Sequence, residues 1–373
     1  MNKKQRVLKA ITILFLGLVL VQCKTEQTYE SKIMGNIFYL GTYTGNNSKG
    51  IYKYVLSDEG HIQPLGLQAA TENPSFLTIS KDGNYLLTVN ETNEGTIESY
   101  KIEKDTLKFI NKSPSGGAHP CFITVNSNGD VLVANYTGGN IGLLKLNGQG
   151  KLSGLLDIQK HEGHGSSERQ QQPHAHSVWF DRKENKVIAV DLGTNELWFS
   201  AIDKDQKKLV PGTPHKLKME VGAGPRHLAL HPKNEWLYVL NELNGTISFL
   251  KKRNGQYTLI SNISALPKDW SDYNTSADIH ISKDGKFLYA SNRGHNSIAI
   301  YAIQADGSLN LIGHESTRGD GPRNFAISPD DRFLLVANQN SNNLVTFKRN
   351  LKTGLLKFVS KTEAFSPVCI IFK

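Results

Sequence analysis

The feature that most constrains the fold of this chain is an internal repeat of about 50 residues. Each unit contains a short strand of alternating apolar residues, a polar turn, a second apolar strand that ends in Asn or Asp, a third strand and a weaker fourth. The stretches "GPRHLALHPKNEWLYVLNELNG" and "GPRNFAISPDDRFLLVANQNSNN" are two examples. The first strands begin 46 to 53 residues apart, at Pro74, Pro120, Pro173, Pro225, Ser276 and Pro322. Four strands in a unit of this length are typical of a β-propeller blade.

The two ends of the repeat region complete each other. The N-terminal "GNIFYLGTYTGNNSKGIYKYVL" matches the second and third strands of a unit, and the C-terminal "SPVCIIFK" matches a first strand. Pairing these ends in one blade would close the ring and remove its exposed sheet edges. We therefore predict an all-β fold over residues 35–373, a seven-bladed propeller with four antiparallel strands in each blade.

The N-terminus has the pattern of an export signal. Residues 1–22 have a basic start and then an apolar run that is short for a transmembrane helix. Cys23 follows directly, which resembles a bacterial lipoprotein signal. We predict a signal peptide over residues 1–22, acylation of Cys23, a linker over residues 23–34, and a place in the cell envelope, periplasmic or at the cell surface. An uncleaved membrane anchor and plain secretion are the alternatives.

Charge and cysteine content exclude several classes of function. Without residues 1–22 the formal net charge falls from +9 to +5, and no Lys/Arg tract is present, which argues against nucleic-acid binding. The apolar surroundings of Cys121 and Cys369 favour buried free thiols. His174 and His176 could share a metal ion, but no third ligand has suitable spacing. Since glycine-rich phosphate loops and dinucleotide fingerprints are also missing, we expect neither a metal nor a cofactor.

The repeat predicts where polar side chains gather. In an antiparallel blade the start of the first strand and the end of the second lie on one face, close to the central axis. The catalytic candidates at these positions are His174, Arg226, Glu242 and Arg293, and His176, two residues further along the strand from His174, is a further candidate. The substrate-binding candidates are Glu91, Asn135, Tyr136, Asp191, Asn241 and Arg323.

Structural interpretations compete with these assignments. Asn at the end of a strand is suited to capping a turn. His174 aligns with Arg226 when Pro173 is taken as the start of its strand. His176 then takes the position that holds Leu, Ile or Phe in the other repeat units, which is compatible with a histidine in the hydrophobic core. Arg323 could pair with a carboxylate of a neighbouring blade.

Several ordered motifs carry a resemblance to a known family. The stretches "GTYT", "NPSFL", "VANYTGGN", "QPHAH", "GPRHLALHP", "LNELNGT", "SNRGH" and "GPRNFAI" resemble the seven-bladed propeller lactonases. That family includes the propeller-type 6-phosphogluconolactonases and is related to the fungal carboxy-muconate lactonizing enzyme. The resemblance implies an active-site set of a histidine of "PHAH" (His174 or His176), Arg226, Glu242 and Arg293.

The expected chemistry is metal-independent hydrolysis of a small lactone. A histidine would activate water, with Glu242 orienting it or serving as the base, and Arg226 would face the developing oxyanion. Arg293 would hold a phosphate, carboxylate or hydroxyl of the substrate. The absence of a Gly-x-Ser-x-Gly elbow argues against a covalent serine route. A lactonizing enzyme of the muconate type and a non-catalytic sugar-binding propeller are the alternatives.

Overall fold

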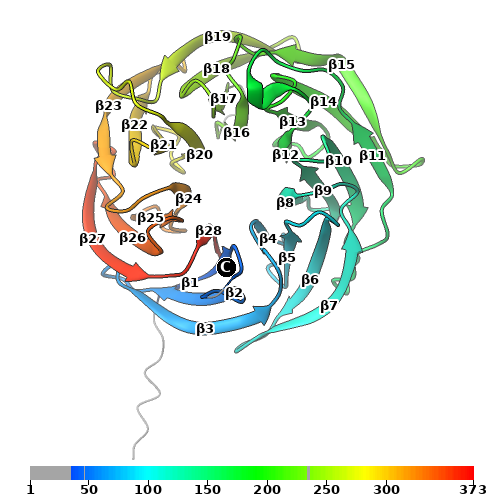
Figure 1. The fold of residues 1–373 in the computed structure, drawn as a ribbon, viewed down its shortest axis with the longest axis horizontal. Coiled ribbons are helices and arrows are strands. Elements are labelled where there is room, and N and C mark those ends of the chain that lie inside the picture. The colour runs from blue at the N-terminus through cyan, green and yellow to red at the C-terminus, as the bar shows by residue number, and fades with distance from the viewer. Residues whose placement is uncertain (1–34, 46, 233–235) are drawn as a thin grey trace, which may run out of the picture. The chain divides into compact units, whose positions relative to one another are not determined.

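The structure is a computed structural model that describes residues 35–45, 47–232 and 236–373. Within these residues the strands form seven four-stranded antiparallel sheets arranged as a ring (Figure 1). The prediction of a seven-bladed propeller is therefore confirmed. The proposed signal peptide, Cys23 and the linker lie outside the described residues. Among the described residues, no helix has the length and apolar character needed to cross a membrane.

Each blade runs from an innermost strand beside the axis to an outermost strand at the rim (Figure 1). In that order, the closing blade contains β28 (Pro367–Phe372), β1 (Asn36–Thr42), β2 (Gly50–Leu56) and β3 (Ile62–Ala70). The next two blades contain β4 (Leu77–Ile79), β5 (Tyr85–Asn90), β6 (Thr96–Ile102) and β7 (Leu107–Pro114), then β8 (Pro120–Val125), β9 (Asp130–Asn135), β10 (Asn140–Lys145) and β11 (Asp157–Lys160).

The remaining four blades follow the same order. They contain β12 (Ala175–Phe180), β13 (Val187–Asp191), β14 (Glu196–Asp203) and β15 (Lys208–Lys218), then β16 (Pro225–Leu230), β17 (Trp236–Asn241), β18 (Thr246–Arg253) and β19 (Gln256–Ser264). After these come β20 (Thr275–Ile281), β21 (Phe287–Arg293), β22 (Ser297–Ile303) and β23 (Leu309–Ser316), then β24 (Pro322–Ile327), β25 (Phe333–Asn338), β26 (Asn343–Arg349) and β27 (Leu356–Glu363).

The closing blade joins the two ends of the ring as the sequence predicts. β28 pairs antiparallel with β1, with Leu40 opposite Ile370 and Phe38 opposite Phe372. The last strand of the chain is thus the innermost strand of the blade that begins the propeller, and it removes the free edge that β1 would otherwise present to the axis.

The hydrophobic core is divided among the junctions between blades. Each of seven apolar clusters in the described part of the chain joins one blade to its neighbour. At one junction, for example, Phe38 and Leu40 of the closing blade pack with Leu335 and Leu344 of the preceding blade. Because both faces of each blade are covered, inner strands such as "FLLVAN" are buried at every position.

Candidate active site

Five innermost strands have a β-bulge near their start. The side chain at each bulge departs from the regular alternation of side chains between the two faces of the sheet. The register shifts between Pro120 and Phe122, Ala175 and Ser177, Pro225 and His227, Ser276 and Ile279, and Pro322 and Asn324. The residues at these shifts are Cys121, His176, Arg226, Ala277 with Asp278, and Arg323. The repeat therefore delivers His176, Arg226 and Arg323 to equivalent positions in three blades.

This register corrects the alignment made from the sequence. Ala175 pairs with Asp191 as Pro225 pairs with Asn241, so the equivalent of Arg226 is His176 and not His174. The position that holds an apolar residue in the other blades, and that the sequence alignment gave to His176, is occupied in this blade by Val178. The sequence alignment was wrong by two residues because Pro173 lies before the strand instead of at its start.

Glu242 lies at the centre of the site, directly after β17. Its backbone N–H donates to the carbonyl of Gly224, and the side chain is buried. Oε2 lies 3.0 Å from Nε of Arg226 and 3.1 Å from Nη2 of Arg293. Oε1 accepts a hydrogen bond of 2.6 Å from Nη1 of Arg169. A single buried carboxylate therefore holds three guanidinium groups, two of which the sequence had assigned to the site.

These contacts set the ionisation of the group. Burial alone would raise the pKa of Glu242, but Arg293, Arg226 and Arg169 lower it to about 2. Burial lowers the pKa of Arg226 to about 9, with Arg293 and Arg323 acting in the same direction. At neutral pH the carboxylate is ionised and Arg226 still carries its charge.

His176 faces the same centre from the neighbouring blade. Its Nε2 lies 3.9 Å from Oε2 of Glu242, and its Nδ1 lies 3.7 Å from Sγ of Cys121. Burial lowers the pKa of His176 well below its ordinary value, and the charges of Arg226, His227 and Arg323 add to this effect. The imidazole is therefore neutral at neutral pH and can accept a proton.

His174 has other neighbours. Its backbone N–H donates to Asp191, its Nδ1 lies 3.0 Å from the carbonyl oxygen of Tyr136, and its ring stacks on that tyrosine at 4.3 Å between centroids. The structure thus separates the two candidate histidines: His176 approaches Glu242, whereas His174 stacks on Tyr136.

A second charged group lies across the axis. Glu91 accepts hydrogen bonds from Tyr43 and Ser75, and Nη2 of Arg323 donates to the Tyr43 hydroxyl at 2.9 Å. Burial acts to lower the pKa of Arg323, but Tyr43, Glu91 and Glu242 raise it overall, so the group stays cationic. A cavity of about 10 Å³ separates this group from Arg226.

Three of the expected substrate-binding residues are buried and make hydrogen bonds within the protein. Asn135, Asp191 and Asn241 have exposed fractions of 0%, and their side chains bond within the loops. Asn135 donates to the carbonyl of Ser115, and Asn241 donates to Thr246 and Ser248. The turn-capping interpretation therefore holds for both asparagines. Asp191 fixes the preceding loop through His161, at 2.7 Å, and accepts from the backbone of Thr194.

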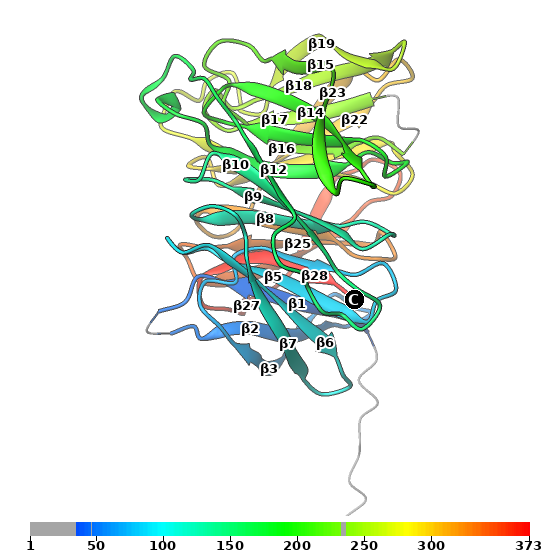
Figure 2. The same cartoon turned by 90° about the vertical axis from the view of Figure 1, so that its right-hand side faces the viewer.

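Arg169 is not among the site residues predicted from the sequence, and it lies in the 3-10 helix η1 (Glu168–Gln170) of the long loop before β12. Besides Glu242, its side chain contacts the Tyr136 hydroxyl at 3.1 Å, and it is 44% exposed. The loop is held down by His161, which stacks on Trp198, and by Gln170, which donates to the Leu192 carbonyl. In the edge-on view of Figure 2 the green segment with η1 projects beyond the strand ends on one face.

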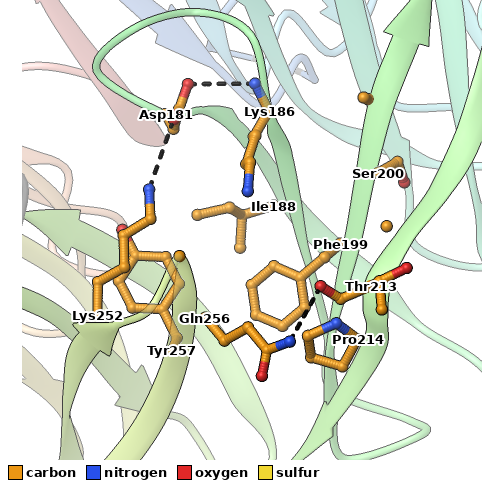
Figure 3. A pocket seen from close by; sticks show the side chains of 13 residues that line it. Asp181, Lys186, Ile188, Phe199, Ser200, Thr213, Pro214, Lys252, Gln256 and Tyr257 are labelled. Carbon is orange, nitrogen blue, oxygen red and sulfur yellow. Dashed lines mark hydrogen bonds and ion pairs between the residues drawn. The ribbon is translucent and has the colours of Figure 1, made fainter.

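Two hollows differ in their relation to this site. One of about 320 Å³ is lined by Arg169, Leu243, Tyr273 and Thr275, so it opens beside the charged cluster. The other, of about 80 Å³, lies between the blades of β12–β15 and β16–β19 and includes Phe199 (Figure 3). None of the residues that line this second hollow belongs to the cluster around Glu242.

The site offers few side chains that could bind a metal ion or act as a thiolate. Within the part of the chain that the structure describes, no group of three or more His, Cys, Asp or Glu side chains could hold a metal ion. Cys121 and Cys369 are free and buried, as expected from the sequence. Burial raises the pKa of both thiols, which keeps them protonated.

The fold and the site together define a class of propeller with a buried charged cluster close to its axis. The family model described as "Lactonase, 7-bladed beta-propeller" matches residues 37–372, and the chain belongs to this family. The 6-phosphogluconolactonase of Bacillus subtilis is 35% identical over 345 residues, which cover 90% of this chain and 98% of the relative. The protein of the same name from Formosa agariphila is 36% identical, covering 86% and 94%.

Solved structures agree with these relatives. A putative 6-phosphogluconolactonase from Bacteroides fragilis superposes with a TM-score of 0.86 at 34% identity, covering 94% of this chain and 100% of that one. A periplasmic gluconolactonase from Pseudomonas aeruginosa has a TM-score of 0.87 at 29% identity, covering 90% and 98%. The chain is thus similar throughout its propeller to proteins named as sugar lactonases.

Proposed function

We propose that this lactonase opens a sugar lactone to its aldonic acid, with His176 as the general base and Arg226 as the donor to the oxyanion. The observation that carries the proposal is the convergence of His176, Arg226 and Arg293 on the buried carboxylate of Glu242. The names of the relatives support the substrate class.

The hydrolytic step needs a base for water and positive charge at the carbonyl oxygen. Neutral His176 takes a proton from water as its oxygen attacks the lactone carbonyl, and the tetrahedral oxyanion develops opposite Arg226. The resulting imidazolium then returns the proton to the ring oxygen as the ester bond breaks. Glu242 stabilises the imidazolium, since its carboxylate lies 3.9 Å from Nε2. Both carboxylate oxygens already accept from or pair with arginines, which favours His176 over Glu242 as the base.

Arginines dominate the charge around this centre. Arg169, Arg226, Arg293 and Arg323 face Glu91 and Glu242, leaving an excess of positive charge. A substrate that carries an anion matches this excess, and Arg169 is the exposed member beside the hollow of about 320 Å³. We therefore place a phosphate or carboxylate at the distal end of the substrate near Arg169.

The test is acid release from glucono-δ-lactone and from its 6-phosphate, with a chelator present and spontaneous hydrolysis subtracted. The proposal expects catalysis that resists the chelator and is lost in Arg226→Ala, and the ratio of the two rates reports the preference for phosphate. Tight binding of either lactone without turnover would instead indicate a sugar-binding propeller, and loss of activity with the chelator would exclude the metal-independent route.

We further propose that residues 1–22 direct export, that Cys23 is acylated, and that residues 23–34 link the anchor to the propeller. The periplasmic location in the name of the Pseudomonas aeruginosa neighbour supports export of such a lactonase. Mass spectrometry of the membrane fraction should show a diacylglyceryl group on Cys23, and Cys23→Ala should release the protein from that fraction. An unmodified N-terminus beginning at Met1 would contradict this proposal.

A further inference from the structure

Behind the oxyanion donor, a buried chain of polar contacts crosses from one innermost strand to the next. Nη1 of Arg226 lies 3.3 Å from Nε2 of His227, and Nδ1 of His227 lies 2.9 Å from Oδ1 of Asp278. His227 and Asp278 are each 3% exposed. They lie on β16 and β20, and the proposed mechanism uses neither of them.

The partners determine which atoms carry the hydrogens. Burial alone would raise the pKa of Asp278, but His280 and His227 hold it well below its usual range, so the carboxylate accepts. A guanidinium can only donate. His227 must therefore carry its hydrogen on Nδ1 and accept at Nε2, which is the neutral imidazole. Burial and the charge of Arg226 lower the pKa of His227 to about 4, in agreement with this assignment.

The surroundings hold this arrangement rigidly. The ring of His227 meets Phe122 and His176 edge-on at 5.5 Å between centroids, and Phe76 and Trp179 lie at 6.0 and 6.4 Å. These four rings leave the imidazole little room to rotate.

The carboxylate is fixed from the opposite side. Oδ2 of Asp278 accepts from Nδ2 of Asn324 at 2.6 Å and lies 2.9 Å from Nε2 of His280. Its Oδ1 also accepts from the backbone of Ile279 at 3.0 Å. The titratable groups that face His227 are thus Arg226, Asp278 and His176, with His280 beyond the carboxylate.

We propose that His227 and Asp278 are positioning residues that hold the plane of the Arg226 guanidinium toward the reacting carbonyl. Arg226 is fixed at three points: Glu242 at Nε, the carbonyl of Ala277 at Nη1, and the imidazole of His227. Because an oxyanion donor acts through its preset direction, loss of the third point lowers the rate of the chemical step more than substrate affinity. This inference rests on the proposed role of Arg226 in lactone hydrolysis.

The kinetic test replaces His227 in three ways. His227→Phe fits the aromatic surroundings but removes the acceptor, and it should lower kcat by about 10–100-fold while KM changes less than threefold. His227→Gln, whose amide reaches the place of Nε2, should recover part of the loss. His227→Asn, whose amide reaches only the place of Nδ1, should not. In the Arg226→Ala background His227→Phe should cause no further loss, since the group that it positions is gone.

A matched control is His314→Phe, which removes a histidine that hydrogen-bonds the carbonyl of Ala265 in another blade and lies outside this cluster. Its kcat should stay within threefold of the unchanged protein. If His227→Phe also stays within threefold, or if its loss adds fully to that of Arg226→Ala, the positioning role is refuted.

A second measurement does not depend on turnover. Side-chain ¹⁵N NMR of histidine-labelled protein, with the His227 signals assigned from His227→Gln, should show the neutral Nδ1–H form from pH 8 to pH 5.5. An Nε2–H form or a cationic ring in that range would overturn the inference. If the protein hydrolyses no lactone, the proposed function fails, and the NMR result still decides whether the hydrogen-bond chain exists.

Discussion

Replacing Glu242 by Gln tests the electrostatic description of the site. The change removes the charge that compensates Arg226 and Arg293 but keeps the size of the side chain. A depression of the Glu242 pKa from 4.5 to about 2 corresponds to about 3 kcal/mol of folding free energy at pH 7, since one pKa unit is worth about 1.4 kcal/mol. This agrees with the roughly 3–5 kcal/mol cost of breaking a buried ion pair.

The stability that Glu242 contributes depends on pH, and the direction of this dependence can be predicted. Because the folded pKa is depressed, the contribution is present above the unfolded pKa of 4.5 and is lost as the pH falls toward about 2. The same two pKa values give about 2 kcal/mol at pH 3.5. The advantage of the unchanged protein over Glu242→Gln should therefore shrink by about 1 kcal/mol between pH 7 and pH 3.5.

Urea unfolding of both proteins at the two pH values measures this difference. Glu220→Gln is the control, because Glu220 is exposed and its carboxylate accepts a hydrogen bond from the Asn262 amide. Its stability should differ from that of the unchanged protein by less than about 0.5 kcal/mol. The description would be refuted if Glu242→Gln were as stable as the unchanged protein at pH 7. It would also be refuted if the loss of stability were the same at both pH values, since the carboxylate would then not compensate the charges of the arginines.

Three further predictions concern activity. Arg226→Ala should lower kcat by about 10²–10³-fold, as measured by initial rates, because it removes the donor to the oxyanion, and a loss below tenfold would contradict that role. Arg169→Gln should lower kcat/KM at least tenfold more for a phosphorylated lactone than for the neutral one, and equal losses would place the anion elsewhere. Because burial lowers the pKa of His176, kcat/KM should stay constant from pH 7.5 to pH 6 and fall only as protonation removes the base at lower pH, so a midpoint at or above 6.5 would argue against His176.

Much of this architecture could be predicted because the repeat determines it. The apolar alternation of each unit reflects burial on both faces of a blade, and the incomplete units at the two ends become β28 and β1 of one sheet. The sequence predicts that three charged residues lie close together, because they occupy equivalent positions of the repeat, where the topology alone sets the distance from the axis. These residues are Arg226, Glu242 and Arg293.

The remaining parts depend on features that a repeat does not encode. Pro173 lies before β12 instead of at its start, so His176 occupies the place that counting from Pro173 gives to His174. Arg169 reaches the site from an insertion whose path depends on the contacts of His161 and Gln170, far from any repeated position. The side chains of Asn135 and Asn241 turn toward the loops because their amides satisfy buried groups there, which the sequence could offer only as an alternative.

The closing blade has a consequence for the order of events in the cell. β28 lies at residues 367–372, so the innermost strand of the first blade is the last part of the propeller to be synthesised. Until those residues have emerged, β1 faces the axis without its partner and the ring stays open. A stop codon a few residues before the end would therefore disrupt the first blade to be synthesised. Quality-control proteases would meet an unpaired β1 edge, which β28 covers in the complete protein.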